Sequence, residues 1–518
     1  MRTTTTLIAL ILTFSAAAQP GWTRQEKRSY DEADFAYYQE DYALSAEMFA
    51  TLYDTHKDHA AMNWKYGAAL LYLNEQRALA VALIEQAMSA GETEAQFHYA
   101  RSLHLSYELD EAIRNFTLYN QAENKEIESL IVDRQIQICH RAKRMLADPI
   151  DVKIQNLGPT INTEANEYVP IVSADNNKLF FTSRRDDSTA QLKDPNGEYF
   201  EDIYSSEKID DQWGDATNVG MPINSETHDA TVALSADGST MILYRTNENL
   251  TGGDLYISEK RGNVWNDPKK LGSQINSNFQ EASACLSSDA SMMIFSSNRP
   301  GGYGGKDLYR VKRLPNGEWS LPKNLGPNIN SAFDDDAPFL DIDLTTLYFS
   351  SMGHATMGGF DIFVSTQIDS ENWSSPENIG YPLNTVGDDI YLAVGAGGRT
   401  GHYSSQQRNG FGGLDIYQVD FIYRQDKTMV IKGQLMDMDE APVQGTITLF
   451  DQYERNVQGV YNTNVNTGKF IMIITPLTIY KVFIEAEGYS TQEDDIYFVL
   501  PEEGDIDFQI APYVLMPE

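Results

Sequence analysis

Five acidic residues recur at one position of a repeated phrase, and their spacing makes them the best candidates for chemistry in this chain. Each lies five residues after an asparagine, and the five are Glu167, Asp229, Glu281, Asp335 and Asp389. If the repeats surround an axis, equivalent side chains lie on a ring, so these carboxylates could face one mouth of a channel. Such a mouth would accept a cation or a basic segment of a partner. Alternatively, each carboxylate caps backbone N–H groups or pairs with an arginine such as Arg185, Arg245 or Arg299.

The other residue types that could support catalysis or metal binding do not form a recognisable motif. Eight histidines are scattered, and the close pair His56 and His59 lies in a polar connection where we expect both to be solvated. The acidic run Asp334 to Asp336 lacks the spaced ligands and glycine of a calcium loop. There is no Gly-x-Ser-x-Gly elbow and no phosphate-binding loop. The sequence therefore predicts no catalytic residue, no cofactor and no metal, and a protein that is not an enzyme.

Charge and the first residues suggest the compartment. Acidic residues outnumber basic ones 75 to 39, which gives a formal charge of −36 and disfavours nucleic acid as a partner. Residues 1–18 have the form of a signal peptide: Arg2, an apolar stretch from Leu7 to Phe14, and a small-residue cleavage site ending at Ala18. No later segment is apolar for long enough to span a bilayer. We expect an exported chain that lies in the periplasm, either free or associated with the outer membrane.

A phrase of the pattern Asn156-Leu-Gly-Pro-Thr-Ile-Asn162 occurs five times, with substitutions, between residues 148 and 424. Its glycines are spaced 62, 52, 54 and 54 residues apart, and they are Gly158, Gly220, Gly272, Gly326 and Gly380. The longer first interval fits a loop insertion around residues 191–199. Each unit has room for about four short strands separated by Gly, Asp and Asn turns, which is the pattern of a propeller blade. The sequence therefore predicts a five-bladed all-β propeller.

The closing strand of this propeller can also be predicted. After the strand at Asp415 to Val419 the chain leaves for another domain, so the last blade lacks an outer strand. The one unused copy of that segment is Val152 to Gly158, ahead of the first blade. We expect the two segments to pair, because pairing leaves no open sheet edge.

The segments on either side of the propeller have different periodicities. In residues 24–147 apolar and small residues recur at helical spacing, and the aligned positions Ser45, Ala80 and Ala112 are 35 and 32 residues apart, close to a 34-residue helix-pair repeat. Residues 428–518 contain short alternating strands and Gly turns, which predict a small β-sandwich. Cys139 and Cys285 fall in different domains and are expected to be free buried thiols.

These three segments resemble known modules: tetratricopeptide repeats, WD40-like propeller repeats and a carboxypeptidase-regulatory-like, transthyretin-like sandwich. The combination resembles a family of Bacteroidetes envelope proteins that includes the PorE-like component of the type IX secretion machinery. Members usually continue into an OmpA-type domain, whereas this sequence ends at Glu518 just after the sandwich. The resemblance implies a non-catalytic scaffold that binds other envelope proteins through its helical repeats and propeller, and the departure from the family pattern puts peptidoglycan binding in doubt.

Two other functions fit the same architecture. A binding module for an envelope glycan or a cation would use the propeller channel, and aromatic and acidic side chains converging at one mouth would favour it. A hydrolase would need a nucleophile and a base brought together in that channel. The sequence shows neither catalytic motif, so it favours the scaffold.

Overall fold

The structure is a computed structural model that describes residues 21–517. Short stretches are excepted, namely 75, 174–175, 195–196, 211, 236–237, 263, 289, 396, 423–428, 452–456, 476–477 and 499–506. The predicted signal peptide at 1–18 lies outside the described residues. The chain divides into two compact units, Met1–His98 and Tyr99–Glu518.

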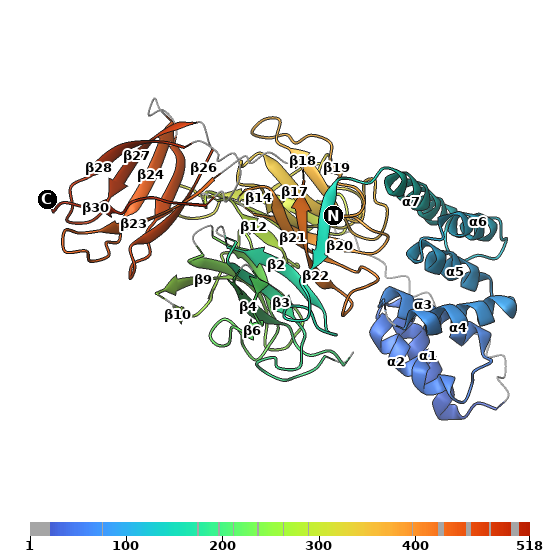
Figure 1. The fold of residues 1–518 in the computed structure, drawn as a ribbon. Coiled ribbons are helices and arrows are strands. Elements are labelled where there is room, and N and C mark those ends of the chain that lie inside the picture. The colour runs from blue at the N-terminus through green and yellow to red at the C-terminus, as the bar shows by residue number, and fades with distance from the viewer. Residues whose placement is uncertain are drawn as a thin grey trace, which may run out of the picture. The chain divides into compact units, whose positions relative to one another are not determined.

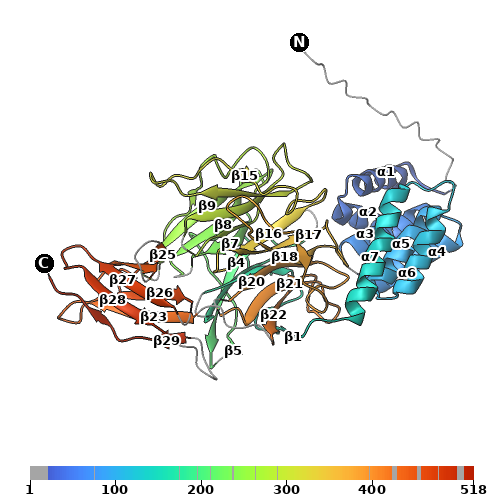
Figure 2. The ribbon, with the colours of Figure 1, turned by 90° about the horizontal axis from the view of Figure 1, so that it is seen from above.

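The described residues contain seven helices, all of them ahead of the first strand (Figure 1). They are α1 (Arg24–Tyr38), α2 (Tyr42–Tyr53), α3 (Ala60–Tyr72), α4 (Arg77–Ser89), α5 (Thr93–Leu105), α6 (Leu109–Asn120) and α7 (Ser129–Ala147). The first helix begins at a capping box, in which the Thr23 side chain accepts the Glu26 N–H and Glu26 accepts the Thr23 N–H. Helices α1 and α2, α3 and α4, and α6 and α7 contact each other, and Figure 2 shows α6 and α7 side by side.

Close approach within the second pair depends on one glycine. A Cβ atom on Gly67 of α3 would lie 2.7 Å from the Ala80 carbonyl oxygen and 2.8 Å from the Ile84 side chain of α4. Any larger residue there would push the two helices apart. The prediction of paired helices is therefore confirmed, whereas their assignment as tetratricopeptide repeats is not.

Five antiparallel sheets follow, and each corresponds to one sequence repeat. Blade 1 contains β2 (Glu167–Val172), β3 (Lys178–Ser183), β4 (Asp202–Ile209), β5 (Gln212–Trp213) and β6 (Thr217–Asn218). Blade 2 contains β7 (Asp229–Leu234), β8 (Thr240–Thr246), β9 (Gly253–Arg261), β10 (Val264–Trp265) and β11 (Lys269–Lys270). Blade 3 contains β12 (Ala284–Leu286), β13 (Met292–Ser297), β14 (Asp307–Lys312) and β15 (Lys323–Asn324). Blade 4 contains β16 (Asp335–Leu340), β17 (Thr346–Ser351), β18 (Asp361–Thr366) and β19 (Glu377–Asn378). Blade 5 contains β20 (Asp389–Val394), β21 (Thr400–Ser405), β22 (Asp415–Phe421) and β1 (Val152–Asn156).

The five sheets close into a propeller. Their first strands contact one another in a cycle, β2 with β7, β7 with β12, β12 with β16, β16 with β20 and β20 with β2. Strand β1 pairs with β22 in antiparallel register, with Val152 opposite Phe421 and Asn156 opposite Tyr417. The predicted five-bladed closure by the strand that precedes blade 1 is thus confirmed.

The repeated phrase holds neighbouring blades together. Each copy carries an aliphatic residue that is fully buried in the core between two blades, and these residues are Ile161, Ile223, Ile275, Ile329 and Leu383. The asparagine that ends each copy forms hydrogen bonds with the backbone of the third strand of the preceding blade. Asn162, for example, accepts the Ile416 N–H at 2.8 Å and donates to its carbonyl at 3.0 Å. The phrase is therefore a structural element of the fold.

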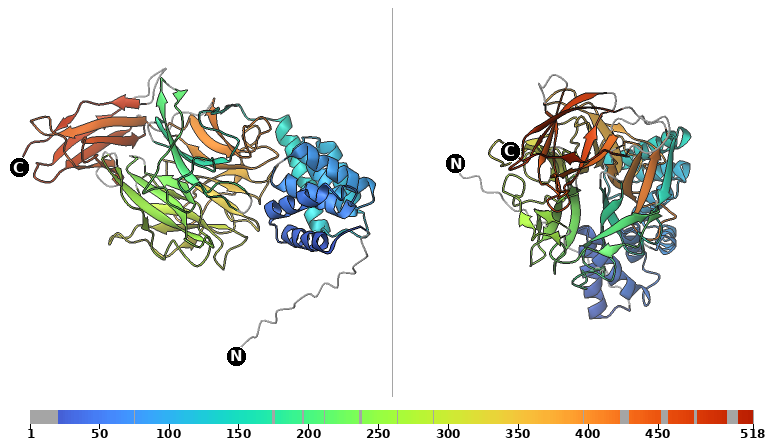
Figure 3. Two further views of the ribbon diagram at one scale, coloured as in Figure 1. Left: turned by 90° about the horizontal axis from the view of Figure 1, so that it is seen from below. Right: turned by 60° about the vertical axis from the view of Figure 1, so that its left-hand side comes forward.

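Two further sheets form the last domain, drawn in red in Figure 3. One contains β25 (Val457–Asn462), β24 (Thr446–Asp451), β27 (Ile479–Glu485) and β28 (Gln492–Tyr497). The other contains β26 (Lys469–Ile474), β23 (Met429–Met436), β29 (Asp507–Gln509) and β30 (Tyr513–Val514). Their apolar faces share one core, which includes Ile431, Leu449 and Val482.

Cys139 and Cys285 are both buried free thiols. Within the described residues, no helix is long and apolar enough to cross a membrane.

Candidate functional site

Four of the five repeated carboxylates begin an innermost strand, Glu281 lies three residues before β12, and all five are at most 1% exposed. Each accepts the backbone N–H of the residue four positions earlier, as Glu167 does from Thr163 at 2.7 Å. In blades 1, 3, 4 and 5 each also accepts a serine hydroxyl from the second strand, as Glu167 does from Ser183 at 2.7 Å. These contacts are those of the structural alternative that the sequence left open.

Three of the five carboxylates also form an ion pair with an arginine. Arg185, Arg245 and Arg299 lie 3.2, 2.5 and 3.2 Å from Glu167, Asp229 and Glu281. In blades 4 and 5 the equivalent residue, two positions after the serine, is Gly353 or Gln407, and not Met352 or Gln406 as the sequence spacing suggested. In blade 4, His354 Nε2 lies 3.7 Å from Asp335 Oδ1.

Burial raises the pKa of four of these carboxylates, those of Glu167, Asp229, Asp335 and Asp389. Burial raises the pKa of Asp229 to about 6 even though Arg245 lowers it. Burial raises the pKa of Asp335, which has no arginine, to about 7, and that of Asp389 well above its usual value. A ring of buried, partly neutral groups that are already hydrogen-bonded within their own blades serves to hold the fold.

A second cluster lies beside this ring and breaks the five-fold pattern. The residue after each repeated carboxylate is Tyr168 in blade 1, but Ala230, Ala282, Asp336 and Ile390 in the others. Each third strand contains an aspartate near its start. The residue before this aspartate is Glu201 in blade 1, but Gly253, Lys306, Phe360 and Leu414 in the other blades. Aromatic and charged side chains are therefore concentrated at selected blades, which a purely structural repeat does not require.

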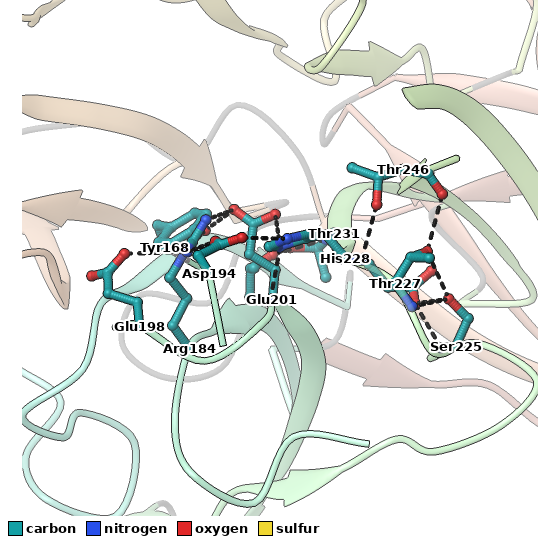
Figure 4. Close-up of polar contacts among 12 residues, drawn as sticks. Tyr168, Arg184, Asp194, Glu198, Glu201, Ser225, Thr227, His228, Thr231 and Thr246 are labelled. Carbon is teal, nitrogen blue, oxygen red and sulfur yellow. Dashed lines mark hydrogen bonds and ion pairs between the residues drawn. The ribbon is translucent and has the colours of Figure 1, made fainter. Parts of the chain in front are cut away.

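The blade 1 half of the cluster centres on Glu201 (Figure 4). The Tyr168 hydroxyl donates a hydrogen bond to Glu201, and Arg184 Nη2 lies 3.2 Å from the same Oε1. Arg184 Nη1 is 2.7 Å from Asp194 Oδ2 and 3.2 Å from Glu198 Oε2. These side chains are partly open to solvent, since Arg184 and Glu201 are 17% and 18% exposed.

His228 connects this half to blade 2. Its Nδ1 lies 3.3 Å from Glu201 Oε2 and 3.2 Å from the Glu201 backbone nitrogen, and its Nε2 lies 3.2 Å from Asp194 Oδ1. Burial lowers the pKa of His228, but the charges of Glu201 and Asp194 outweigh burial and raise it overall. The ring thus orients two acidic side chains toward Arg184.

Glu201 and Tyr168, which share a hydrogen bond, have pKa values shifted in opposite directions. Burial alone would raise the pKa of Glu201, but hydrogen bonds from His228 and Tyr168 and the charge of Arg184 lower it to about 2. Burial and the charge of Glu201 raise the pKa of Tyr168 well above its usual value of 10. The proton therefore stays on Tyr168, and Glu201 is a carboxylate at every physiological pH.

The other half comes from blades 3, 4 and 5. The Tyr391 ring centroid lies 6.4 Å from that of Tyr168, with 24° between the planes. Lys306 Nζ lies 2.8 Å from Asp336 Oδ2, and Ser283 donates to the other oxygen of Asp336. Burial raises the pKa of Tyr391, and the negative charges of Asp336 and Glu201 raise it further. Both acidic groups therefore lie near the Tyr391 hydroxyl, which brings all five blades to one place.

Strained backbone occurs within or next to the residues of this cluster. Val169, Ala337 and Tyr391 occupy equivalent positions in blades 1, 4 and 5 and have φ values of 51°, 50° and 63°. The register of the first two strands shifts there in each of these blades. A left-handed residue that is not glycine costs roughly 1–3 kcal/mol, and bulges of this kind re-aim side chains next to functional sites.

The sequence analysis did not identify this cluster. Its members are spread from Tyr168 to Tyr391 and meet only because the propeller closes. Asp194 and Glu198 come from the insertion at 191–199, which was interpreted only as a loop. The signal available in the sequence was the mismatch between repeats, with Tyr168 and Glu201 in the first unit and residues of other types at the equivalent positions of the other units.

No group of three or more His, Cys, Asp or Glu side chains among the described residues is arranged to hold a metal ion.

Comparisons with known proteins returned similar structures but no relatives in sequence. No family model matches the chain, and no curated protein matches it. Among solved structures, an endo-arabinase from Bacteroides thetaiotaomicron is 12% identical, with 52% of this chain and 99% of that chain covered at a TM-score of 0.35. An α-L-arabinofuranosidase from Lactobacillus brevis is 10% identical, with 51% and 91% covered at a TM-score of 0.33. Hydrazine synthase from Kuenenia stuttgartiensis is 9% identical, with 67% and 62% covered at a TM-score of 0.30.

These comparisons correct two expectations from the sequence. Glycoside hydrolases recur among the similar structures, which contradicts the interpretation of the chain as a non-catalytic scaffold and the expectation that it is not an enzyme. The scaffold interpretation is therefore abandoned. At identities of 7–12% the likeness assigns no activity to this chain, so a function has to be argued from its own site.

Proposed function

We propose that the propeller binds a glycan at the mouth of its channel, where Tyr168 and Tyr391 lie beside Glu201 and Asp336. The observation that supports this most directly is the convergence of two tyrosine rings and two carboxylates from three different blades. Convergent aromatic and acidic side chains were the feature expected of a binding module. A ligand site of this kind combines apolar surface with a few fixed polar groups.

The chemistry of the cluster suits a polyhydroxylated ligand. The ring faces of Tyr168 and Tyr391 carry negative charge density, which attracts the polarised C–H groups of a sugar ring. The carboxylates of Glu201 and Asp336 accept hydroxyl protons, while Arg184 can donate to a hydroxyl or ring oxygen. Because neighbouring groups already fix these side chains, little conformational freedom is lost when a ligand binds.

A free cation fits this site less well than a sugar. Each central carboxylate already has a positive partner, since Arg184 lies 3.2 Å from Glu201 and Lys306 lies 2.8 Å from Asp336. A cation would have to displace these partners, whereas a hydroxyl group can add to them. The glycan is therefore the better of the two ligands considered for the channel.

Saturation-transfer NMR on the full chain tests this proposal with a panel of neutral, amino and acidic oligosaccharides. We expect saturation transfer to at least one neutral sugar, and a strong reduction in Glu201→Gln, which keeps the shape but removes the charge. Glu207→Gln is the matched control, because Glu207 is ion-paired to Lys178 on the exposed part of β4. The proposal is wrong if no sugar receives saturation, or if Glu201→Gln and Glu207→Gln behave alike.

Two expectations from the sequence accompany this function as proposals. The form of residues 1–18 supports export to the periplasm, where glycans of the envelope would be available. The paired helices and the spacing of Ser45, Ala80 and Ala112 support a tetratricopeptide-like array that binds envelope proteins. Amino-terminal sequencing of the protein from fractionated cells tests the first of these, since processing near Ala18 is expected.

A further inference from the structure

The propeller channel continues past the cluster as a narrow apolar cavity of about 120 Å³. Its wall is formed by consecutive residues along the five innermost strands, and none of the described residues that line it carries a charged side chain. The wall segments are 169–172, 231–234, 282–286, 337–339 and 391–395. Tyr391 lines one part of the cavity and also belongs to the cluster above, whereas Val172, Leu234 and Leu286 line it farther along the strands.

Several features remove polar groups from this wall. Pro170 and Pro338 occupy equivalent positions of blades 1 and 4, and proline has no N–H to present at an open strand edge. The Thr231 hydroxyl donates to the Val169 carbonyl at 2.8 Å, so it is engaged within the wall. The Ser283 hydroxyl is likewise engaged with Asp336. The Thr231 and Ser283 hydroxyls thus have partners in the protein.

The dimensions restrict what the cavity can hold. Four strand residues extend about 13 Å at ~3.3 Å each, so 120 Å³ spread over that length leaves room for one slender chain. Most of the exposed wall is apolar, so an alkyl chain buries apolar surface when it enters the cavity. A sugar ring would bury its hydroxyl groups against this mostly apolar wall, which costs free energy.

We propose that the channel is a second binding site, which takes an unbranched alkyl chain such as that of an acyl or alkyl group. The proposal does not rest on glycan binding, since it depends only on the wall of the channel. An alkyl chain could belong to a free amphiphile or to a glycolipid, and the probes below distinguish these sources.

Calorimetric titration of the full chain with n-alcohols from ethanol to octanol, kept below their solubility limits, tests the channel alone. Each added methylene group that enters the channel should raise affinity about fourfold, up to a length beyond which it stays constant. The n-alkyl glucosides of the same lengths, used below their micelle concentrations, test whether a sugar head changes this series. An equal gain per methylene in both series indicates a chain site that ignores the head, whereas a larger affinity for every glucoside indicates a glycolipid.

Variants that fill the channel provide the decisive control. Ala282→Leu and Ala393→Leu each add an apolar side chain to the wall and should abolish the dependence on chain length. Ala147→Leu makes the same change on the exposed end of α7 and should leave that dependence unchanged.

Affinity that is independent of chain length in the unmodified protein would overturn the proposal. The same conclusion follows if folded Ala282→Leu and Ala393→Leu variants bind octanol as tightly as Ala147→Leu does. Loss of glycan binding in the variants of Glu201 would not affect this test, because n-alcohols carry no sugar.

Discussion

The rings of Tyr168 and Tyr391 lie 6.4 Å apart although the two residues belong to the first and last blades of the propeller. They are brought together by the pairing of β1 with β22, which joins the end of the propeller to its beginning. The candidate site therefore depends on ring closure, and the stability of that closure is the first property to test.

Replacement of Ile154 by serine should open the closing strand. Ile154 pairs with Val419 and packs against the core between blades 4 and 5, so its loss should lower the free energy of unfolding by about 2 kcal/mol. Lys153→Ser, on the exposed face of the same strand, should change it by less than about 0.5 kcal/mol. Urea unfolding followed by tryptophan fluorescence measures both, and equal effects would show that β1 does not hold the ring closed.

The repeated carboxylates should differ in importance according to their partners. Asp229→Asn leaves the Arg245 guanidinium without its buried counter-charge and should destabilise the propeller by about 3 kcal/mol. Asp335→Asn faces no arginine and should cost only about 1 kcal/mol at pH 7. Chemical unfolding of the two variants under one set of conditions makes the comparison, and a larger cost for Asp335→Asn would contradict this account.

Stability should fall as the pH rises from 5 to 8. The pKa values of Asp335 and Asp361 are raised to about 7 in the folded chain, above their value of 3.8 in the unfolded chain. The folded state therefore binds more protons in this range, and its advantage is full below about pH 4 and lost as the pH passes 7. From these two groups we expect roughly 5 kcal/mol less stability at pH 8 than at pH 5.

The variant Asp335→Asn provides the control for this pH dependence. It should unfold with a shallower dependence on pH than the unmodified chain, because one of the two shifted groups is gone. If the two profiles are parallel, Asp335 is ionised in the folded protein and its pKa is not raised.

The fold was largely predictable because each blade repeats the same sequence pattern and the same contacts. The phrase ending at Asn162 buries an aliphatic side chain and bridges a strand, so its five copies indicated five blades and a missing outer strand. The ring of carboxylates was predictable as a pattern, whereas its burial at 0–1% exposure depends on how the blades pack. The cluster around Glu201 was not predictable by this route, because it consists of departures from the repeat that come together only when the ring closes.

Isothermal titration of the best-binding oligosaccharide into the unmodified chain and into Tyr391→Gly tests the central claim most directly. Glycine tolerates the φ of 63° at this position, so the variant should fold while losing the aromatic face. We predict an affinity at least about tenfold lower for Tyr391→Gly, and no change for Tyr303→Ala, a tyrosine 53% exposed in a turn of blade 3. Equal affinities of folded Tyr391→Gly and the unmodified chain would place the glycan elsewhere and contradict the account.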